Sequence, residues 1–248
     1  MTDMVLQKPE SLSLLVARHL KQAIVEARLK LGEALSENKI ATTLNVSRTP
    51  VREALNILQM QGLIDILPQK GSFVFLPSKQ DIAALAEFRL MLERQGAALA
   101  LARAPALTLK DMQKALRTMK KASASKDSVA YARADDLFHL AVFDHCENAY
   151  LKDAYNAVAG RIAALRCHLS GPLKLYQNQT FGEHREIAAA LAAGDLRLLQ
   201  SRIGQHITGM QANYIAAIED GLLQVPNVRP RSKGPRRRPA EDADTGQL

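Results

Sequence analysis

The chain has 248 residues, 47% of them hydrophobic, which is enough to bury a substantial core in one large domain or two ordinary ones. Its formal charge of +8 favours a polyanionic partner, although a whole-chain sum does not locate that partner. Cys146 and Cys167 have no metal-type spacing, no N-terminal signal pattern appears, and no apolar run approaches the roughly 18 residues that cross a bilayer. We therefore expect reduced thiols in a cytoplasmic protein with no membrane partner.

Residues 1–77 are predicted to form three helices followed by a hairpin. Apolar side chains recur at helical spacing over residues 12–27 and define the first helix. Ser36 is the expected N-cap of a short second helix. The third helix is predicted over about 47–62, with Pro50 in its first turn, where a missing N–H costs nothing. Two short helices joined by a tight turn make a helix-turn-helix.

The next segment, "LIDILPQKGSFVFL", predicts two strands around a Pro-Gln-Lys-Gly turn, which is the wing of a winged helix-turn-helix. In that fold the N-terminal end of the third helix enters the DNA major groove. Arg48 and Arg52 are four residues apart and share a helix face, and arginine can make paired hydrogen bonds to guanine. Ser47 and Thr49 add hydroxyl groups beside the free N–H groups of the helix start. The alternative for an isolated pair of this kind is two ordinary solvated arginines.

The stretch "VSRTPVREALNILQMQGLI", with a glycine at the tip of the following hairpin, resembles the N-terminal module of the GntR family of bacterial transcription regulators. The resemblance implies DNA contacts from six residues: Ser47, Arg48, Thr49, Pro50, Arg52 and Gly71. The chain departs from the family pattern where "KLG" replaces the more usual proline-glycine, and where Asn38 replaces an arginine of some members.

Residues 78–225 contain almost no strand signal and predict an antiparallel all-helical bundle, so that the fold class is mainly α. Its helices are expected at about 79–104, 108–124, 128–146, 150–170, 174–193 and 195–221. No glycine-rich phosphate loop or common hydrolase motif occurs. Residues 226–248, which include "RPRSKGPRRRP", are predicted to be a basic disordered tail.

Within the bundle, Asp135 and His139 are four residues apart and project from one helix face, while His184 and His206 lie on two other predicted helices. These four side chains would suit a divalent transition metal, with zinc favoured and nickel or manganese as alternatives. Any one of these histidines alone is more often structural. The remaining histidines are interpreted as structural: His19, His145 and His168.

With these residues, the bundle resembles the FCD effector domain of the FadR-type branch of the GntR family. The resemblance implies that a metal and nearby cationic side chains hold a small organic carboxylate, which acts as the signal. Arg89 is the candidate second anchor, because a planar guanidinium can bind both carboxylate oxygens. An intrahelical pair with Glu93 is the alternative for Arg89, and Arg161 and Arg166 are weaker candidates.

The resulting hypothesis is a homodimeric repressor that binds double-stranded operator DNA and is released by a small carboxylate or sugar acid. A mononuclear metal-dependent enzyme fused to a DNA-binding domain is the alternative, but it would need a general acid or base that the sequence does not supply. A scaffold or nucleoid-type protein would account for the basic tail, yet it needs no effector bundle. We therefore interpret the chain as a regulator and not as an enzyme.

Overall fold

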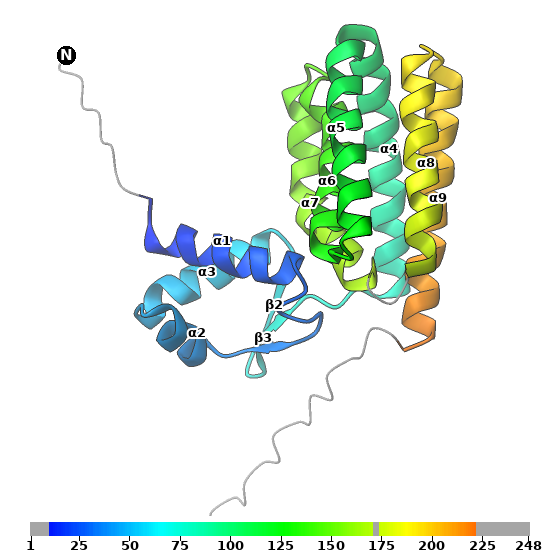
Figure 1. Ribbon diagram of the computed structural model, residues 1–248. Helices are drawn as coiled ribbons and strands as arrows, with labels where there is room; N and C mark the ends of the chain where they lie inside the picture. Colours follow the sequence, from blue (N-terminus) through cyan, green and yellow to red (C-terminus); the bar gives the residue numbers. More distant parts are fainter. Residues whose placement is uncertain (1–9, 171–173, 222–248) are drawn as a thin grey trace, which may run out of the picture.

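The computed structural model describes residues 10–170 and 174–221, shown in Figure 1. The described residues form nine helices and one small sheet, which confirms the mainly α fold class. In chain order the elements are α1 (Leu12–Val25), β1 (Ala34–Leu35), α2 (Glu37–Leu44), α3 (Arg48–Met60), β2 (Ile64–Leu67), β3 (Gly71–Val74), α4 (Lys79–Arg103), α5 (Pro105–Ala124), α6 (Ser128–Asp144), α7 (Ala149–Ser170), α8 (Lys174–Ala192) and α9 (Leu196–Glu219). The predicted basic tail, 226–248, lies outside the described residues.

The helix-turn-helix is fixed by local signals at its helix ends. Ser36 caps α2 as predicted, with its hydroxyl oxygen 3.3 Å from the backbone N–H nitrogen of Lys39. Asn45 then adopts a left-handed conformation (φ 51°) and turns the chain towards α3. Gly62 follows α3 with φ 65°, a conformation that costs least for glycine.

The wing contains one strand more than the sequence pattern predicts. β2 and β3 form the predicted antiparallel hairpin, and the two-residue β1 pairs with the other edge of β3. Ala34 lies opposite Phe73 in this register. A strand of two residues is too short to show an alternating pattern, which is why sequence reasoning missed it.

Six helices, α4 to α9, make up the bundle, and their bounds lie within a few residues of the predicted ones. The largest difference at a helix start is α5, which begins at Pro105 and not near residue 108, because proline is well suited to the first helical position. Cys146 and Cys167 are buried and form no disulfide. Within the described residues, no helix has the length and apolar character needed to cross a membrane.

The N-terminal module packs against one end of the bundle, where α1 contacts α7 (Figure 1). One buried apolar cluster contains Leu63, which follows α3, together with Leu165 of α7 and Tyr214 of α9. Arg161 of α7 donates from Nε to the backbone oxygen of Gly62, at 2.7 Å. Helix α7 is therefore a direct physical link between the bundle and the helix-turn-helix.

Candidate functional site

The start of α3 presents the predicted DNA-binding residues to solvent. Ser47, Arg48, Thr49 and Arg52 are exposed, because α3 directs the opposite, apolar face into the core. Pro50 is half-buried. The arrangement leaves the N-terminal end of α3 accessible, as a helix that enters the major groove requires.

Gly71 is exposed at the start of β3, beside the wing turn, with φ 112°. A Cβ atom at this position would meet no other atom within 4 Å. The reason for glycine here is therefore the backbone conformation and not a shortage of space.

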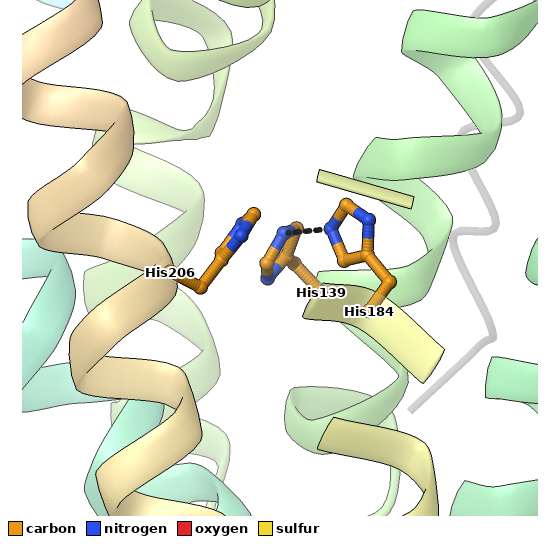
Figure 2. Close-up of side chains that lie close together, drawn as sticks. All are labelled: His139, His184 and His206. Atoms are coloured by element: carbon orange, nitrogen blue, oxygen red, sulfur yellow. Dashed lines mark hydrogen bonds between the residues drawn. The ribbon is translucent and has the colours of Figure 1, made fainter. Parts of the chain in front are cut away.

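Three histidines meet in the core of the bundle, as Figure 2 shows. His139 comes from α6, His184 from α8 and His206 from α9, and all three are buried. One ring nitrogen of each lies within 4.8 Å of the others. The Nε2 atoms of His139 and His184 are 3.2 Å apart.

Asp135 lies beside this cluster, one helical turn before His139 on α6. Its Oδ1 is 3.4 Å from Nε2 of His139 and 3.8 Å from Nε2 of His184. The three histidines form the group with mutual distances within 4.8 Å, and Asp135 is not part of it. Its Oδ1 lies 2.7 Å from Nε of Arg166, which also pairs with Asp136. Arg166 is therefore part of the site, which sequence reasoning had ranked among the weaker candidates.

Two glutamates contact the Nδ1 atoms of two of the histidine rings. Nδ1 of His139 is 2.8 Å from a carboxylate oxygen of Glu93, and Nδ1 of His206 is 2.8 Å from one of Glu183. A carboxylate on Nδ1 favours the tautomer that carries its proton there and leaves Nε2 as the lone-pair donor. Neither glutamate was predicted to contact a histidine, because their positions in sequence give no sign that they face histidines of another helix.

Arg89 is buried and makes the intrahelical pair with Glu93 that the sequence offered as the alternative to an effector anchor. Its Nε donates to Glu93 at 2.5 Å, which is the intrahelical pair. Its Nη2 lies 3.0 Å from Nε2 of His139, so the guanidinium also faces the histidine cluster. A metal ion and Arg89 would compete for this Nε2 lone pair.

The four buried charges of the site balance. Burial opposes the ionisation of Asp135, but the charge of Arg166 lowers the pKa of that carboxyl well below its usual range. Burial also opposes the ionisation of Glu93, yet Arg89 and His139 lower its pKa below the ordinary value. Two guanidiniums therefore face two carboxylates among the fully buried groups, and the partly exposed carboxylates of Asp136 and Glu183 lie beside them.

The pKa values of the three histidines are shifted in different directions. Burial holds the pKa of His184 and of His206 well below the ordinary value, so both rings are neutral at neutral pH. Burial acts in the same direction on His139, but the carboxylates of Glu93 and Asp135 together outweigh it and raise the pKa of this ring. Neutral rings are the form that binds a metal.

These residues fit a divalent metal. Two nitrogens bound at 2.0–2.1 Å to one tetrahedral zinc lie about 3.3 Å apart, close to the 3.2 Å between Nε2 of His139 and of His184. Nδ1 of His184 is buried and has no hydrogen-bond partner among the described residues, so nothing there restrains its ring. The donor set of imidazoles beside one carboxylate suits zinc, nickel or manganese.

A small cavity reaches Arg89 but is lined by none of the three histidines. It is lined by Arg89 and Tyr214, among others, and has a volume of about 20 Å³. This is room for about one water molecule. A carboxylate can enter only if side chains around Arg89 move.

Comparisons with known proteins match both parts of the chain to known families. Residues 12–74 match the family described as "Bacterial regulatory proteins, gntR family", and residues 84–209 match the FCD domain. The chain is 30% identical over 184 residues to a probable D-xylose utilization operon transcriptional repressor of Paenarthrobacter nicotinovorans, which covers 74% of this chain and 80% of that protein. It is 29% identical over 209 residues to the HTH-type transcriptional regulator LutR of Bacillus subtilis, covering 76% of this chain and 94% of the relative.

Solved structures give the same fold. A GntR transcriptional regulator from Rhodococcus, described as putative in its own report, has a TM-score of 0.74 and 26% identity, covering 83% of this chain and 98% of that one. McbR/YncC of Escherichia coli shares the fold, with a TM-score of 0.73 and 23% identity over 85% of this chain and 100% of its own.

A winged helix-turn-helix joined to an FCD bundle is the architecture of a class of DNA-binding transcription regulators. The chain belongs to the GntR family of bacterial regulatory proteins. Its relatives are regulators and not enzymes, which confirms the interpretation of the chain as a non-enzyme.

Proposed function

We propose that the protein is a repressor that binds operator DNA as a homodimer and is released by a small carboxylate or sugar acid bound at a metal site in the bundle. The main observation behind the proposal is that the ring nitrogens of His139, His184 and His206 lie close together in a buried site. The names of relatives support it, since one is a repressor of a D-xylose utilization operon and another, 33% identical over 141 residues, is a gluconate operon repressor. Gluconate is itself a sugar acid. Because the operator is chromosomal DNA, we place the protein in the cytoplasm.

The electrostatics of the site support an anionic effector. A bound divalent metal supplies two positive charges and open coordination positions for a carboxylate. The four fully buried charges around it sum to zero, and the partly exposed carboxylates of Asp136 and Glu183 lie at the edge of the site, so the positive charge that an anion would meet is that of the metal. If the Nη2 group of Arg89 moved away from Nε2 of His139, it could donate a hydrogen bond to the second carboxylate oxygen of the effector. The Nε group of Arg89 would stay hydrogen-bonded to Glu93.

Helix α7 contacts both the histidine site and the DNA-binding module, so a change at the site could be transmitted through this helix. Arg166 on α7 pairs with Asp135 beside the histidines, and Arg161 on the same helix binds the backbone of Gly62, at the end of α3. His168, further along α7, contacts the backbone oxygen of Leu29 at 3.1 Å. Since the cavity is too small for an effector, its entry would have to shift side chains that contact α7. An effector shifts DNA affinity only as far as it prefers one arrangement over another.

The homodimer is proposed from the size of the recognition surface. One α3 reads too few base pairs to identify a site in a genome, so two copies on an inverted repeat are needed. Analytical ultracentrifugation should give two chains per DNA site. A monomer both free and on DNA would contradict this part of the proposal.

The proposal is tested by a screen of carboxylic and sugar acids for thermal stabilisation of the full chain. Each acid that raises the Tm is then tested for release of DNA from the region upstream of the protein's own gene. A true effector weakens DNA binding in the wild type about 5- to 150-fold. It should not do so in His184→Ala, while His145→Ala is the matched control, because His145 pairs with Asp111 away from the cluster. Acids that stabilise both variants equally would refute the site.

A further inference from the structure

Glu37, the first residue of α2, contacts both arginines that α3 presents to solvent. Its Oε2 lies 3.2 Å from Nη2 of Arg48 and 3.1 Å from Nη2 of Arg52, and its Oε1 lies 3.5 Å from Nε of Arg52. One carboxylate thus bridges two guanidiniums at the centre of the proposed recognition surface. Hydrogen bonds from Arg52 lower the pKa of Glu37, so the carboxylate is charged at neutral pH.

The contacts leave each arginine free to bind a base at the same time. A guanidinium offers one pair of N–H groups from Nε and Nη2 and a second pair from its two terminal nitrogens. Arg52 meets Glu37 through Nε and Nη2, which leaves both N–H groups of Nη1 and one of Nη2 for guanine. Arg48 uses only Nη2. Glu37 therefore need not release either side chain for DNA to bind.

The ion pairs contribute little to the stability of the fold. The side chains of Arg48 and Arg52 are 59% and 61% exposed, and exposed ion pairs are weak because water and salt screen them. Their consequence is a preferred orientation, since a guanidinium that contacts Glu37 samples fewer rotamers than one that contacts only water. Preorganised side chains bind with a smaller loss of entropy on DNA.

We propose that Glu37 is a specificity-determining positioning residue, which holds Arg48 and Arg52 in the orientation that reads guanine and lowers the attraction of this surface for phosphate. The second effect follows from charge, because one carboxylate offsets one of two guanidiniums. Weaker attraction to phosphate lowers the affinity for every sequence by a similar factor, so the ratio of specific to nonspecific affinity depends on the orientation in which Glu37 holds the two arginines. This inference rests on the proposed recognition of operator DNA by α3.

The experiment compares Glu37→Gln with wild type on two duplexes at one salt concentration. One duplex is selected by the wild-type full chain from a random pool, and the other is a random sequence of the same length. Glu53→Gln is the matched control, because it removes the same charge from an exposed position beside Arg52 that faces no arginine of this bridge.

For Glu37→Gln, we expect the ratio of selected to random affinity to fall on the order of tenfold, with random DNA bound at least as tightly as by wild type. Glu53→Gln should keep a ratio within twofold of wild type. A ratio for Glu37→Gln within twofold of wild type, or an equal fall in Glu53→Gln, overturns the inference.

A second variant separates a loss of positioning from a loss of folding. If Glu37→Gln lowers the Tm, the same comparison is made with Glu37→Asp, which keeps the charge but shortens the reach of the carboxylate. We expect its ratio to fall while its affinity for random DNA stays at the wild-type level, and an unchanged ratio overturns the positioning role. If Arg48→Ala and Arg52→Ala both keep full affinity for the selected duplex, the proposed recognition surface itself fails, which is a different result.

Discussion

Arg166 and Asp135 form a buried ion pair in the bundle, with Nε of the arginine 2.7 Å from Oδ1 of the aspartate. The two side chains are 2% and 4% exposed. The same carboxylate oxygen lies 3.4 Å from Nε2 of His139, so the pair joins α7 to the histidine cluster. The arginine thereby fixes the position of the aspartate nearest to the proposed metal.

Loss of Arg166 should destabilise the bundle. We expect Arg166→Ala to lower the free energy of unfolding by about 3–5 kcal/mol, because it leaves the carboxylate of Asp135 buried without its cation. Denaturant unfolding followed by circular dichroism measures this change. Arg117→Ala, on an exposed position of α5, should change stability by less than about 0.5 kcal/mol. Equal effects of the two substitutions would contradict the structural role of the pair.

The recognition arginines should affect DNA binding without affecting the fold. Arg48→Ala and Arg52→Ala each remove an exposed guanidinium, so the Tm should stay close to that of wild type. If each reads one guanine, its loss should cost about 1–3 kcal/mol and relax the preference at one base pair. Binding to a panel of single-base operator variants measures both effects. Uniform weakening across the panel would show phosphate contacts only, and unchanged affinity in both variants would remove α3 from the interface.

The link between Arg161 and Gly62 should carry the effector response. Arg161→Ala removes the hydrogen bond to the Gly62 backbone, but operator affinity without effector should change little, because the contact lies beyond the C-terminal end of α3 and the proposed DNA contacts lie at its N-terminal end. The effector-induced change in operator affinity should fall below the range of about 5- to 150-fold expected for the wild type. Titration of operator binding with and without effector tests this. A full response in Arg161→Ala would show that coupling follows another route.

Much of the fold could be predicted because the signals are local. Ser36, Asn45, Pro50 and Gly62 mark helix ends and turns through their own backbone chemistry, and the apolar spacing of the long helices is unambiguous. The two-residue β1 carried no such pattern.

Only part of the arrangement around the histidines could be predicted, because most of its contacts join separate helices. Spacing of four residues places Asp135 and His139 on one face, but it cannot show that the aspartate pairs with Arg166. That contact, and those of Glu93 and Glu183 with the histidine rings, depend on how separate helices pack. Long-range packing has no short-range sequence signal.

In the proposed function, the bundle holds one divalent metal through its histidines, and elemental analysis of the purified protein measures this metal. The full chain should be purified without chelator and without nickel resin. We predict about one equivalent of transition metal per chain in the wild type and in His145→Ala, and less than about 0.1 equivalent in His184→Ala, since zinc sites need three or four protein ligands. The wild type with well below one equivalent, or His184→Ala with as much metal as the wild type, would contradict the account.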